Sequence, residues 1–379
     1  MARNGVVSAD SHMTEPLDLW EERIDARFRA RAPKVIENKR GEGARYLFIA
    51  EGSAPFPIAG GFAAGRSGKE LQALLDKGYE AARPSGWDPV ERLKDQDLDG
   101  IDAEVLYPSL GMSLFPMTDG ELQRACFDAY NGWLGEFCSH DRRRLYGVGL
   151  VSLENIENAA KDVERIARQG MKGAMIWGAA PAERPYSDRA YDPFWRAASE
   201  AGLPVSLHII ASRGRVSSSV SEAIGQGAKV HSGVWYMRVI SEIQESLAQI
   251  VFGGVLERFP KLKIVSAEND AGWLPHFGYR MDHVYDKYHE IWAESTPLPP
   301  SAYLKRQVYA TFQDDYTGPA AHAIFGADNF MWASDFPHSD STFPESRSWI
   351  EKNFAGIPEN VRRKIVCQNA VKLYGMNLA

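Results

Sequence analysis

Short apolar runs rich in β-branched residues alternate along the chain with longer stretches of helical periodicity. Stretches such as 156–169 and 192–201 have the helical pattern and separate most of the apolar runs. Eight strands alternating with helices predict an α/β fold with a parallel sheet, and eight strands are enough to close a small barrel. The predicted strands are residues 6–9, 103–107, 145–153, 173–177, 205–209, 264–267, 308–312 and 330–333.

The alternative to a barrel is an open, doubly wound sheet. No GxGxxG or P-loop sequence opens any predicted helix, so a nucleotide-binding sheet of that kind has no support. The predicted fold class is therefore α/β, a (β/α)8 TIM barrel, and residues 1–379 form one barrel domain.

Two segments are longer than a minimal barrel needs. Residues 14–85, rich in Gly, Pro and Arg, form a loop and helical insertion after strand one, and residues 211–262 form a helical insertion after strand five. Insertions that follow barrel strands lie on the face that carries active sites, so both are expected to shape a pocket. The apolar helical pattern of residues 234–256 also suits a subunit interface, and we expect a homo-oligomer, most simply a dimer.

Composition narrows the function classes. Hydrophobic residues make up 44% and charged residues 25%, as in an ordinary globular protein. The net charge of -7 and the lack of a basic block argue against nucleic-acid binding. No apolar run is long enough for a membrane span, and the first ten residues lack a signal-peptide core. Cys126, Cys138 and Cys367 are scattered without CxxC spacing, which favours a reducing cytoplasm over a disulfide framework.

Four side chains that can bind metals fall at the ends of predicted strands. Asp10 and His12 follow strand one, and residues two apart on an extended backbone point the same way. His208 closes strand five, and Asp335 follows strand eight. Alone, each has a simpler interpretation as a cap, a turn residue or a hydrogen-bonded core histidine. Together they occupy the rim where barrels place catalytic groups, which predicts a metal site.

This order of motifs resembles the amidohydrolase superfamily. Asp10-Ser11-His12, the strand-five His208 and the SDFPH run at 334–338 are most similar to the amidohydrolase-2 branch, which includes aminocarboxymuconate semialdehyde, resorcylate and carboxyvanillate decarboxylases. The resemblance also covers residues 99–108, 256–265 and 364–375 and is poorest over residues 14–85.

The resemblance implies that Asp10, His12, His208 and Asp335 hold one divalent metal ion. Many relatives carry HxH at strand one, whereas several decarboxylases have an acidic residue first, as this chain does with Asp10. Two imidazoles and two carboxylates suit Zn(II), with Mn(II) as the alternative.

The chain departs from the family pattern at strand six. Glu268 stands where relatives often have a histidine that is a proposed acid/base group. Glu268 can replace it as an acid/base catalyst if its pKa is suitable, or it can orient a ligand histidine. We therefore name Asp335 and Glu268 as candidate catalytic residues. Asp270, His276 and Arg280, in the stretch that follows, are interpreted as surface residues.

The leading functional hypothesis is a metal-dependent hydrolase that acts on a small, carboxylated or aromatic substrate through an activated water. The alternative is a metal-dependent nonoxidative decarboxylase, and a catalytically inactive binding barrel is a third hypothesis. Either Arg213 or Arg215 would receive a substrate carboxylate. The candidate substrate-binding residues are Tyr107, Trp177, Arg213 and His338.

Overall fold

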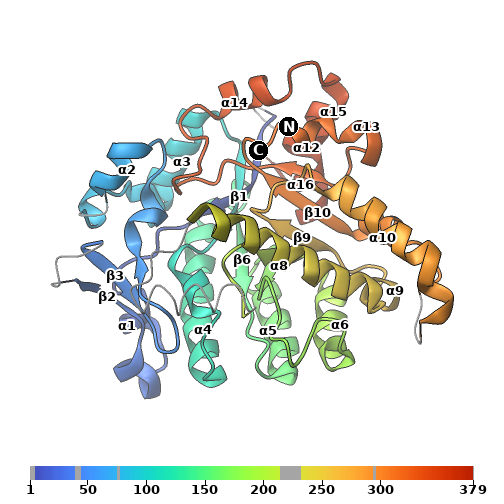
Figure 1. Ribbon diagram of the computed structural model, residues 1–379. Helices are drawn as coiled ribbons and strands as arrows, with labels where there is room; N and C mark the ends of the chain where they lie inside the picture. The colour runs from blue at the N-terminus through green and yellow to red at the C-terminus, as the bar shows by residue number, and fades with distance from the viewer. Residues whose placement is uncertain (1–4, 39–43, 75–76, 214–231, 293–295, 379) are drawn as a thin grey trace.

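The computed structural model describes residues 5–38, 44–74, 77–213, 232–292 and 296–378. Eight parallel strands follow one another in a single sheet, ordered β1-β5-β6-β7-β8-β9-β10-β11 (Figure 1). Their order is the order of the chain, as in a (β/α)8 barrel, and the predicted fold class is confirmed. The strands are β1 (Val7–His12), β5 (Ala103–Tyr107), β6 (Leu145–Leu150), β7 (Gly173–Ile176), β8 (Val205–His208), β9 (Ile264–Ala267), β10 (Val308–Phe312) and β11 (Phe330–Trp332).

The first and last strands meet at a seam that nearly closes the barrel. The backbone N–H of Asp335 donates to the carbonyl of Asp10 (3.0 Å), and the N–H of His12 donates to the carbonyl of Phe336 (2.6 Å). The Ser8 hydroxyl oxygen accepts the Ser334 N–H at 2.8 Å and strengthens the same seam. The segments that carry three expected metal ligands are therefore fixed to each other by backbone hydrogen bonds.

All eight barrel strands are fully buried, as parallel strands covered on both faces must be. Their predicted positions agree with the observed ones within three residues at each end. The largest consequence is at β1, which was expected to end at Ala9 but continues to His12. Asp10 and His12 are therefore part of the strand, and a shift in register against β5 between Ser8 and Ser11 accommodates them.

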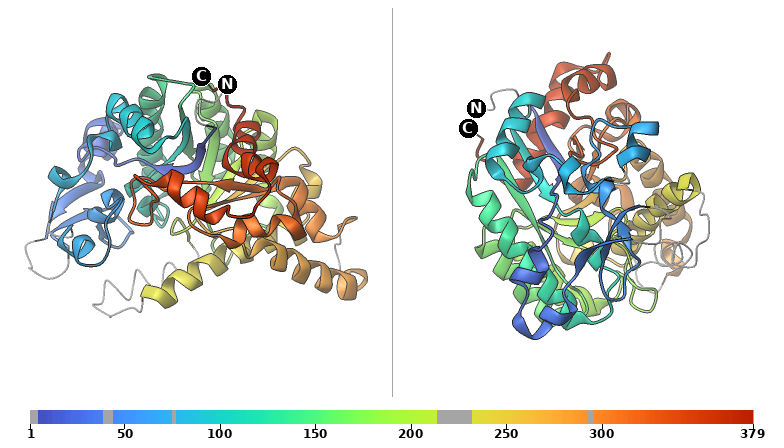
Figure 2. Two further views of the ribbon diagram at one scale, coloured as in Figure 1. Left: turned by 90° about the horizontal axis from the view of Figure 1, so that it is seen from above. Right: turned by 90° about the vertical axis from the view of Figure 1, so that its left-hand side faces the viewer.

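Helices surround the sheet (Figures 1 and 2). Several begin where the sequence supplies a capping side chain: Asp88, Asp119 and Asn155 each accept backbone N–H bonds from the first turn of the helix that follows. The longer helices are α3 (Pro89–Asp99), α4 (Gly120–Ser139), α5 (Ile156–Arg168), α6 (Asp192–Ala201), α8 (Ser232–Phe252), α10 (Leu274–Tyr288), α11 (Pro300–Gln307) and α14 (Ser346–Asn353). The shorter ones are α1 (Leu19–Arg23), α2 (Gly68–Leu74), α9 (Val255–Arg258), α12 (Thr317–Ala320), α13 (His322–Phe325), α15 (Glu359–Arg363) and α16 (Asn369–Tyr374).

The first insertion contains strands that the sequence pattern did not predict. β2 (Lys34–Glu37), β3 (Tyr46–Ile49) and β4 (Phe56–Pro57) form a small antiparallel sheet beside the barrel (Figure 1). Only loops and helices were expected there, because strands of two to four residues with few buried positions leave no clear alternation. The insertion is joined to the barrel by Trp20, whose indole N–H donates to the Cys126 carbonyl on α4 at 3.1 Å.

The second insertion contains the predicted apolar helix, divided into α8 and α9 at Gly253 and Gly254. Gly254 has a φ of 68°, a left-handed conformation that suits glycine and turns the chain. Residues 214–231, including Arg215, lie outside the described part of the chain. Among the helices that the structure describes, none is both long and apolar enough to cross a membrane. The expected dimer stays a prediction.

Candidate metal centre

Five side chains converge at the carboxyl ends of four barrel strands. Asp10 and His12 come from β1, His208 ends β8, Glu268 follows β9 and Asp335 follows β11. The side chains of Asp10, His12, His208 and Asp335 have no solvent exposure, and that of Glu268 is 9% exposed. The structure thus brings together the four expected metal ligands and the residue that departs from the family pattern.

The spacing of their polar atoms matches a shared ion. His12 Nε2 lies 3.5 Å from Asp10 Oδ1, 3.5 Å from Glu268 Oε2 and 3.3 Å from Asp335 Oδ1. His208 Nε2 lies 3.7 Å from Asp10 Oδ1 and 3.4 Å from Glu268 Oε2. Donors bound at about 2.1 Å to one ion are separated by roughly 3.0 Å at octahedral and 3.4 Å at tetrahedral angles. These five pairs of atoms therefore have the distances expected between neighbouring ligands of one ion.

None of these five atoms has a hydrogen-bond partner, although all are buried. Orphaned buried polar atoms are rare in folded proteins, and five that face one another call for a common partner. Two imidazole nitrogens and three carboxylate oxygens are ligands for a divalent transition metal. The residues present fit such an ion.

The two histidines are held in the tautomer that metal binding requires. His12 Nδ1 lies 2.6 Å from the Pro108 carbonyl oxygen, and His208 Nδ1 lies 2.9 Å from that of Ile209. A carbonyl only accepts, so each Nδ1 carries a proton and donates. In the neutral rings, the lone pair is therefore on Nε2, which faces the cluster.

Thr311 was not predicted as a site residue, yet it links two of the carboxylate residues. Its hydroxyl donates to Asp10 Oδ2 at 2.9 Å and accepts the backbone N–H of Glu268 at 2.8 Å. Asp10 is thereby oriented with its other oxygen, Oδ1, toward the histidines. The sequence signal that could have identified Thr311 is its position as a polar residue within the apolar run of β10.

Burial and charge oppose each other within the cluster. Burial would raise the pKa of Asp10, but the adjacent imidazoles of His12 and His208 outweigh it and hold the pKa below its usual range. For Asp335, burial and then the nearby charge of Glu268 raise the pKa well above normal. Three carboxylates this close need positive charge among them, and a divalent cation would supply it.

Unusual backbone geometry aims several of these side chains. Glu268 and Asp335 both have a φ of 55°, and Ile210, just after His208, has a φ of 71°. Left-handed conformations are uncommon for non-glycine residues and rarest for β-branched ones, and they concentrate at functional sites. Each occurs within three residues of the end of a barrel strand, where the chain turns away after presenting a site residue.

His338 lies against the cluster, as expected for a pocket residue. Its ring stacks on His12 at a centroid distance of 3.9 Å. The Ser109 hydroxyl donates to the Met13 carbonyl at 2.5 Å, so His338 Nε2 must donate to the Ser109 oxygen 2.8 Å away. Burial and then the charge of His12 lower the pKa of His338, which leaves the lone pair of its neutral Nδ1 3.2 Å from Asp335 Oδ1.

Tyr107 is enclosed beneath the histidines. Its side chain is fully buried, and its hydroxyl lies 2.8 Å from Ser206 Oγ and 3.4 Å from the Tyr374 hydroxyl on α16. Its ring lies 5.3 Å from that of His208. These contacts support the packing of the barrel interior, and the predicted substrate role of Tyr107 stays a prediction.

Trp177 and Arg213 contact each other beside the rim. The Arg213 guanidinium lies over the Trp177 ring at 5.5 Å and forms an ion pair with Glu154. The Trp177 indole donates to the Phe115 carbonyl at 3.0 Å. Arg213 therefore already has a carboxylate partner, and its predicted role in holding a substrate carboxylate stays untested.

Arg92 connects the cluster to α3. It is fully buried and binds Glu104 through two hydrogen bonds, at 2.6 and 3.2 Å. Its third contact is to the His12 carbonyl at 2.8 Å, and its guanidinium also lies over the Phe336 ring at 4.8 Å. Nothing in the sequence pattern distinguished this arginine from the many surface arginines. Its contacts hold the backbone on both sides of the barrel seam.

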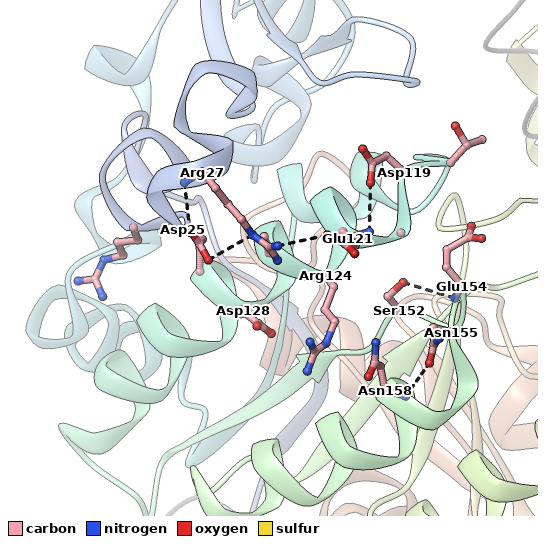
Figure 3. A pocket seen from close by; sticks show the side chains of 15 residues that line it. Asp25, Arg27, Asp119, Glu121, Arg124, Asp128, Ser152, Glu154, Asn155 and Asn158 are labelled. Atoms are coloured by element: carbon pink, nitrogen blue, oxygen red, sulfur yellow. Dashed lines mark hydrogen bonds and ion pairs between the residues drawn. The ribbon is translucent and has the colours of Figure 1, made fainter.

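A separate polar cavity of about 780 Å³ lies where α4 and α5 begin (Figure 3). The charged groups that line it already have partners: Arg27 is paired with Glu121, and Arg124 with Asp162 outside the lining. None of the five cluster residues lines this cavity. Asp270, His276 and Arg280 are exposed, in agreement with their interpretation as surface residues.

An eight-stranded parallel barrel that gathers imidazoles and carboxylates at its carboxyl-terminal rim defines a class of metal-dependent enzymes. The chain belongs to the amidohydrolase family, whose model matches residues 75–376. The match includes His208, Glu268 and Asp335, whereas Asp10 and His12 lie before it. The resemblance stated from the motifs is confirmed, and so is the enzyme class, a metal-dependent hydrolase or carboxy-lyase.

Three known proteins illustrate the relationship. The chain is 22% identical over 295 residues, 77% of each chain, to 2-amino-3-carboxymuconate-6-semialdehyde decarboxylase of Dictyostelium discoideum. An amidohydrolase from Mycobacterium avium subsp. paratuberculosis has a TM-score of 0.80 at 24% identity, covering 98% of this chain and 99% of its own. The 5-carboxyvanillate decarboxylase of Novosphingobium aromaticivorans, solved with manganese, has a TM-score of 0.67 at 20% identity, covering 99% and 97%. At these identities the two solved structures show a shared fold.

Proposed function

We propose that this protein is a metal-dependent hydrolase of a small substrate, with Asp10, His12, His208 and Asp335 as ligands of one divalent ion. The observation that carries the proposal is the set of buried, unpartnered donor atoms facing one another at the barrel rim. A divalent ion held there supplies a Lewis acid that polarises a carbonyl group and makes water more acidic.

Asp335 is placed to move the proton. Neither of its carboxylate oxygens has a hydrogen-bond partner, and Oδ1 lies 3.2 Å from His338 Nδ1. One oxygen suffices to face the ion, so the other is available to accept the proton of an attacking water. A base with this access in a water-poor site is what acyl hydrolysis requires.

The charges around the site favour a substrate without a free carboxylate. Two arginines near the rim, Arg92 and Arg213, are already bound to Glu104 and Glu154. Although Asp270 is exposed, partial desolvation and then the charges of nearby aspartates raise its pKa to about 7. A carboxylated substrate would therefore approach an acidic rim. A neutral ester, amide or lactone fits better, which narrows the substrate class expected from the sequence.

Nonoxidative decarboxylation of an aromatic or unsaturated acid is the second candidate. The names of the carboxymuconate semialdehyde and carboxyvanillate decarboxylases among the similar proteins favour it. In that reaction Asp335 would deliver a proton to the carbon from which CO2 departs, rather than accept one from water.

Isotope labelling separates the two reactions. The metal-loaded protein would be incubated in 18O-labelled water with a panel of lactones, esters, amides and hydroxybenzoates. We expect a carboxylate product that contains 18O and no release of CO2. Release of CO2 from a phenolic acid, without 18O in the remaining product, would replace hydrolysis by decarboxylation. The variant His276→Ala, altered at an exposed residue of α10, serves as the control for nonspecific effects.

A further inference from the structure

Glu268 has the same relation to the two histidines as the expected carboxylate ligands have. Its Oε2 lies 3.5 Å from His12 Nε2 and 3.4 Å from His208 Nε2. The corresponding distances from Asp10 Oδ1 are 3.5 and 3.7 Å. An ion that reaches Asp10 and both imidazoles is therefore within reach of Glu268.

Glu268 is not placed to orient a histidine from outside the ligand set. A residue with that function accepts the proton of the ring nitrogen that faces away from the metal. In His12 and His208, those Nδ1 atoms already donate to the carbonyls of Pro108 and Ile209. Glu268 instead faces the Nε2 atoms, whose lone pairs would repel a carboxylate unless a cation lay between them.

The backbone around Glu268 is fixed in a way that suits a ligand. Its φ of 55° costs on the order of 1–3 kcal/mol for a non-glycine residue. The Thr311 hydroxyl holds it there by accepting its N–H at 2.8 Å, and the same hydroxyl donates to Asp10 Oδ2. One threonine therefore holds both the Asp10 carboxylate and the backbone of Glu268.

We propose, on the basis of the metal-dependent function above, that Glu268 is a fifth protein ligand of the ion, in addition to Asp10, His12, His208 and Asp335. Catalytic zinc sites typically have three protein ligands and an open tetrahedral position. Five protein donors with one open position suit an octahedral ion, and three carboxylate oxygens suit a harder one. Three carboxylates around a divalent ion also leave one net negative charge, in keeping with a neutral substrate.

The test compares metal affinities of the full-length protein and its variants. Dissociation constants for Mn(II) and Zn(II) would be measured by competition with chelators for wild type, Glu268→Gln and Asp270→Asn. Loss of an outer contact typically costs 10–100-fold in metal affinity, so loss of a ligand should cost more than about 100-fold for Mn(II). The loss for Zn(II) should be smaller, because four donors remain. Asp270→Asn removes a neighbouring charge that is outside the cluster and should change either affinity only a few fold.

Co(II) substitution reports coordination number without any activity measurement. The wild-type protein should show the weak visible absorption of five- or six-coordinate Co(II), and Glu268→Gln should show stronger absorption because it loses a ligand. Glu268→Asp keeps the charge but shortens the side chain, so absorption stronger than that of wild type in this variant would support direct ligation even if the Gln variant folds poorly.

Two results would overturn the inference in different ways. If Glu268→Gln binds Mn(II) as wild type does, with an unchanged Co(II) spectrum, Glu268 is not a ligand, and the proposed function stands. If the wild-type protein binds none of the three metals, the proposed function fails and the inference fails with it.

Discussion

Two groups of buried carboxylates in this barrel differ in what surrounds them. Glu15 and Glu104 are almost fully enclosed, and protein donors engage both oxygens of each. Asp10, Glu268 and Asp335 are also buried, yet each leaves at least one oxygen without a hydrogen bond. Burial of an unsatisfied charge is costly, and a fold retains it where the charge has another use.

Glu15 is an example of a buried carboxylate whose two oxygens both accept hydrogen bonds. Its Oε1 accepts the backbone N–H groups of Ser109 and Gly111 at 3.1 and 2.9 Å, and its Oε2 accepts that of Leu110 at 3.0 Å. These bonds fix the loop after β5, which carries the hydroxyl that binds His338. The satisfied carboxylate of Glu15 holds a loop in place, whereas we propose that the unsatisfied ones bind a metal ion. The predictions below test this distinction.

The largest effect is expected from changing a proposed metal ligand. His208→Ala should lower metal content below about a tenth of an equivalent and activity below about a hundredth of wild type, because even outer contacts contribute 10–100-fold. Metal analysis and turnover would be measured on the same sample. His276→Ala should match wild type in both. Full metal content in His208→Ala would exclude this residue from the site.

Breaking the buried ion pair between Arg92 and Glu104 should mainly reduce the stability of the fold. Arg92→Met leaves Glu104 buried without its cation, which should lower the free energy of unfolding by about 3–5 kcal/mol. Arg23→Met breaks the exposed pair with Glu136 and should cost less than about 1 kcal/mol. Urea denaturation of both metal-free variants would measure the difference. Equal losses would show that burial does not distinguish the two pairs.

Asp99 is intermediate between the satisfied and the unsatisfied carboxylates, because it accepts hydrogen bonds from the N–H and hydroxyl of Ser346 but has no ion pair with any residue that the structure describes. Burial raises its pKa from 3.8 to about 6. The folded state therefore binds the proton more tightly than the unfolded chain, and this stabilisation, present below pH 3.8, is lost as the pH rises to about 6. The loss is about 3 kcal/mol. Relative to wild type, Asp99→Asn should gain stability across this range and then level off. A parallel pH dependence of the two proteins would contradict the shift.

The smallest effects should have opposite signs. In the metal-free protein, Asp335→Asn should raise the free energy of unfolding by about 1–2 kcal/mol, because it removes an unsatisfied buried charge. Glu15→Gln should lower it by a similar amount, since an amide cannot accept all three backbone N–H bonds. Thermal unfolding in the presence of a chelator would compare them. A loss of stability in both variants would remove the distinction between the two groups.

Much of the candidate site could be predicted because its expected metal ligands lie at the ends of apolar strands. Asp10, His12, His208 and Asp335 each follow a run of buried residues, so the barrel order alone placed them on one rim. Glu268 could be recognised in the sequence as a departure from the family pattern at strand six. Whether it orients a histidine, acts in catalysis or binds the metal depended on its distances to His12 and His208. Its interpretation changed for that reason.

Individual side-chain hydrogen bonds between residues far apart in the chain could not be predicted from the sequence. Thr311 was one polar residue in a strand, and Arg92 was one arginine on an amphipathic helix. Thr311 is hydrogen-bonded to Asp10, which is 301 positions away in the chain. Arg92 is hydrogen-bonded to His12, which is 80 positions away. The small sheet of the first insertion was missed because its strands are too short for their periodicity to be recognised.

The sequence by itself determined the barrel, because hydrophobic periodicity fixes which strand ends share a face, and its motifs indicated the family, which implied the four expected ligands. Only the tertiary structure decided which polar atoms in that face are satisfied and which are not. That distinction depends on the approach of groups within about 3 Å, whereas periodicity specifies no more than which side of a strand faces the core.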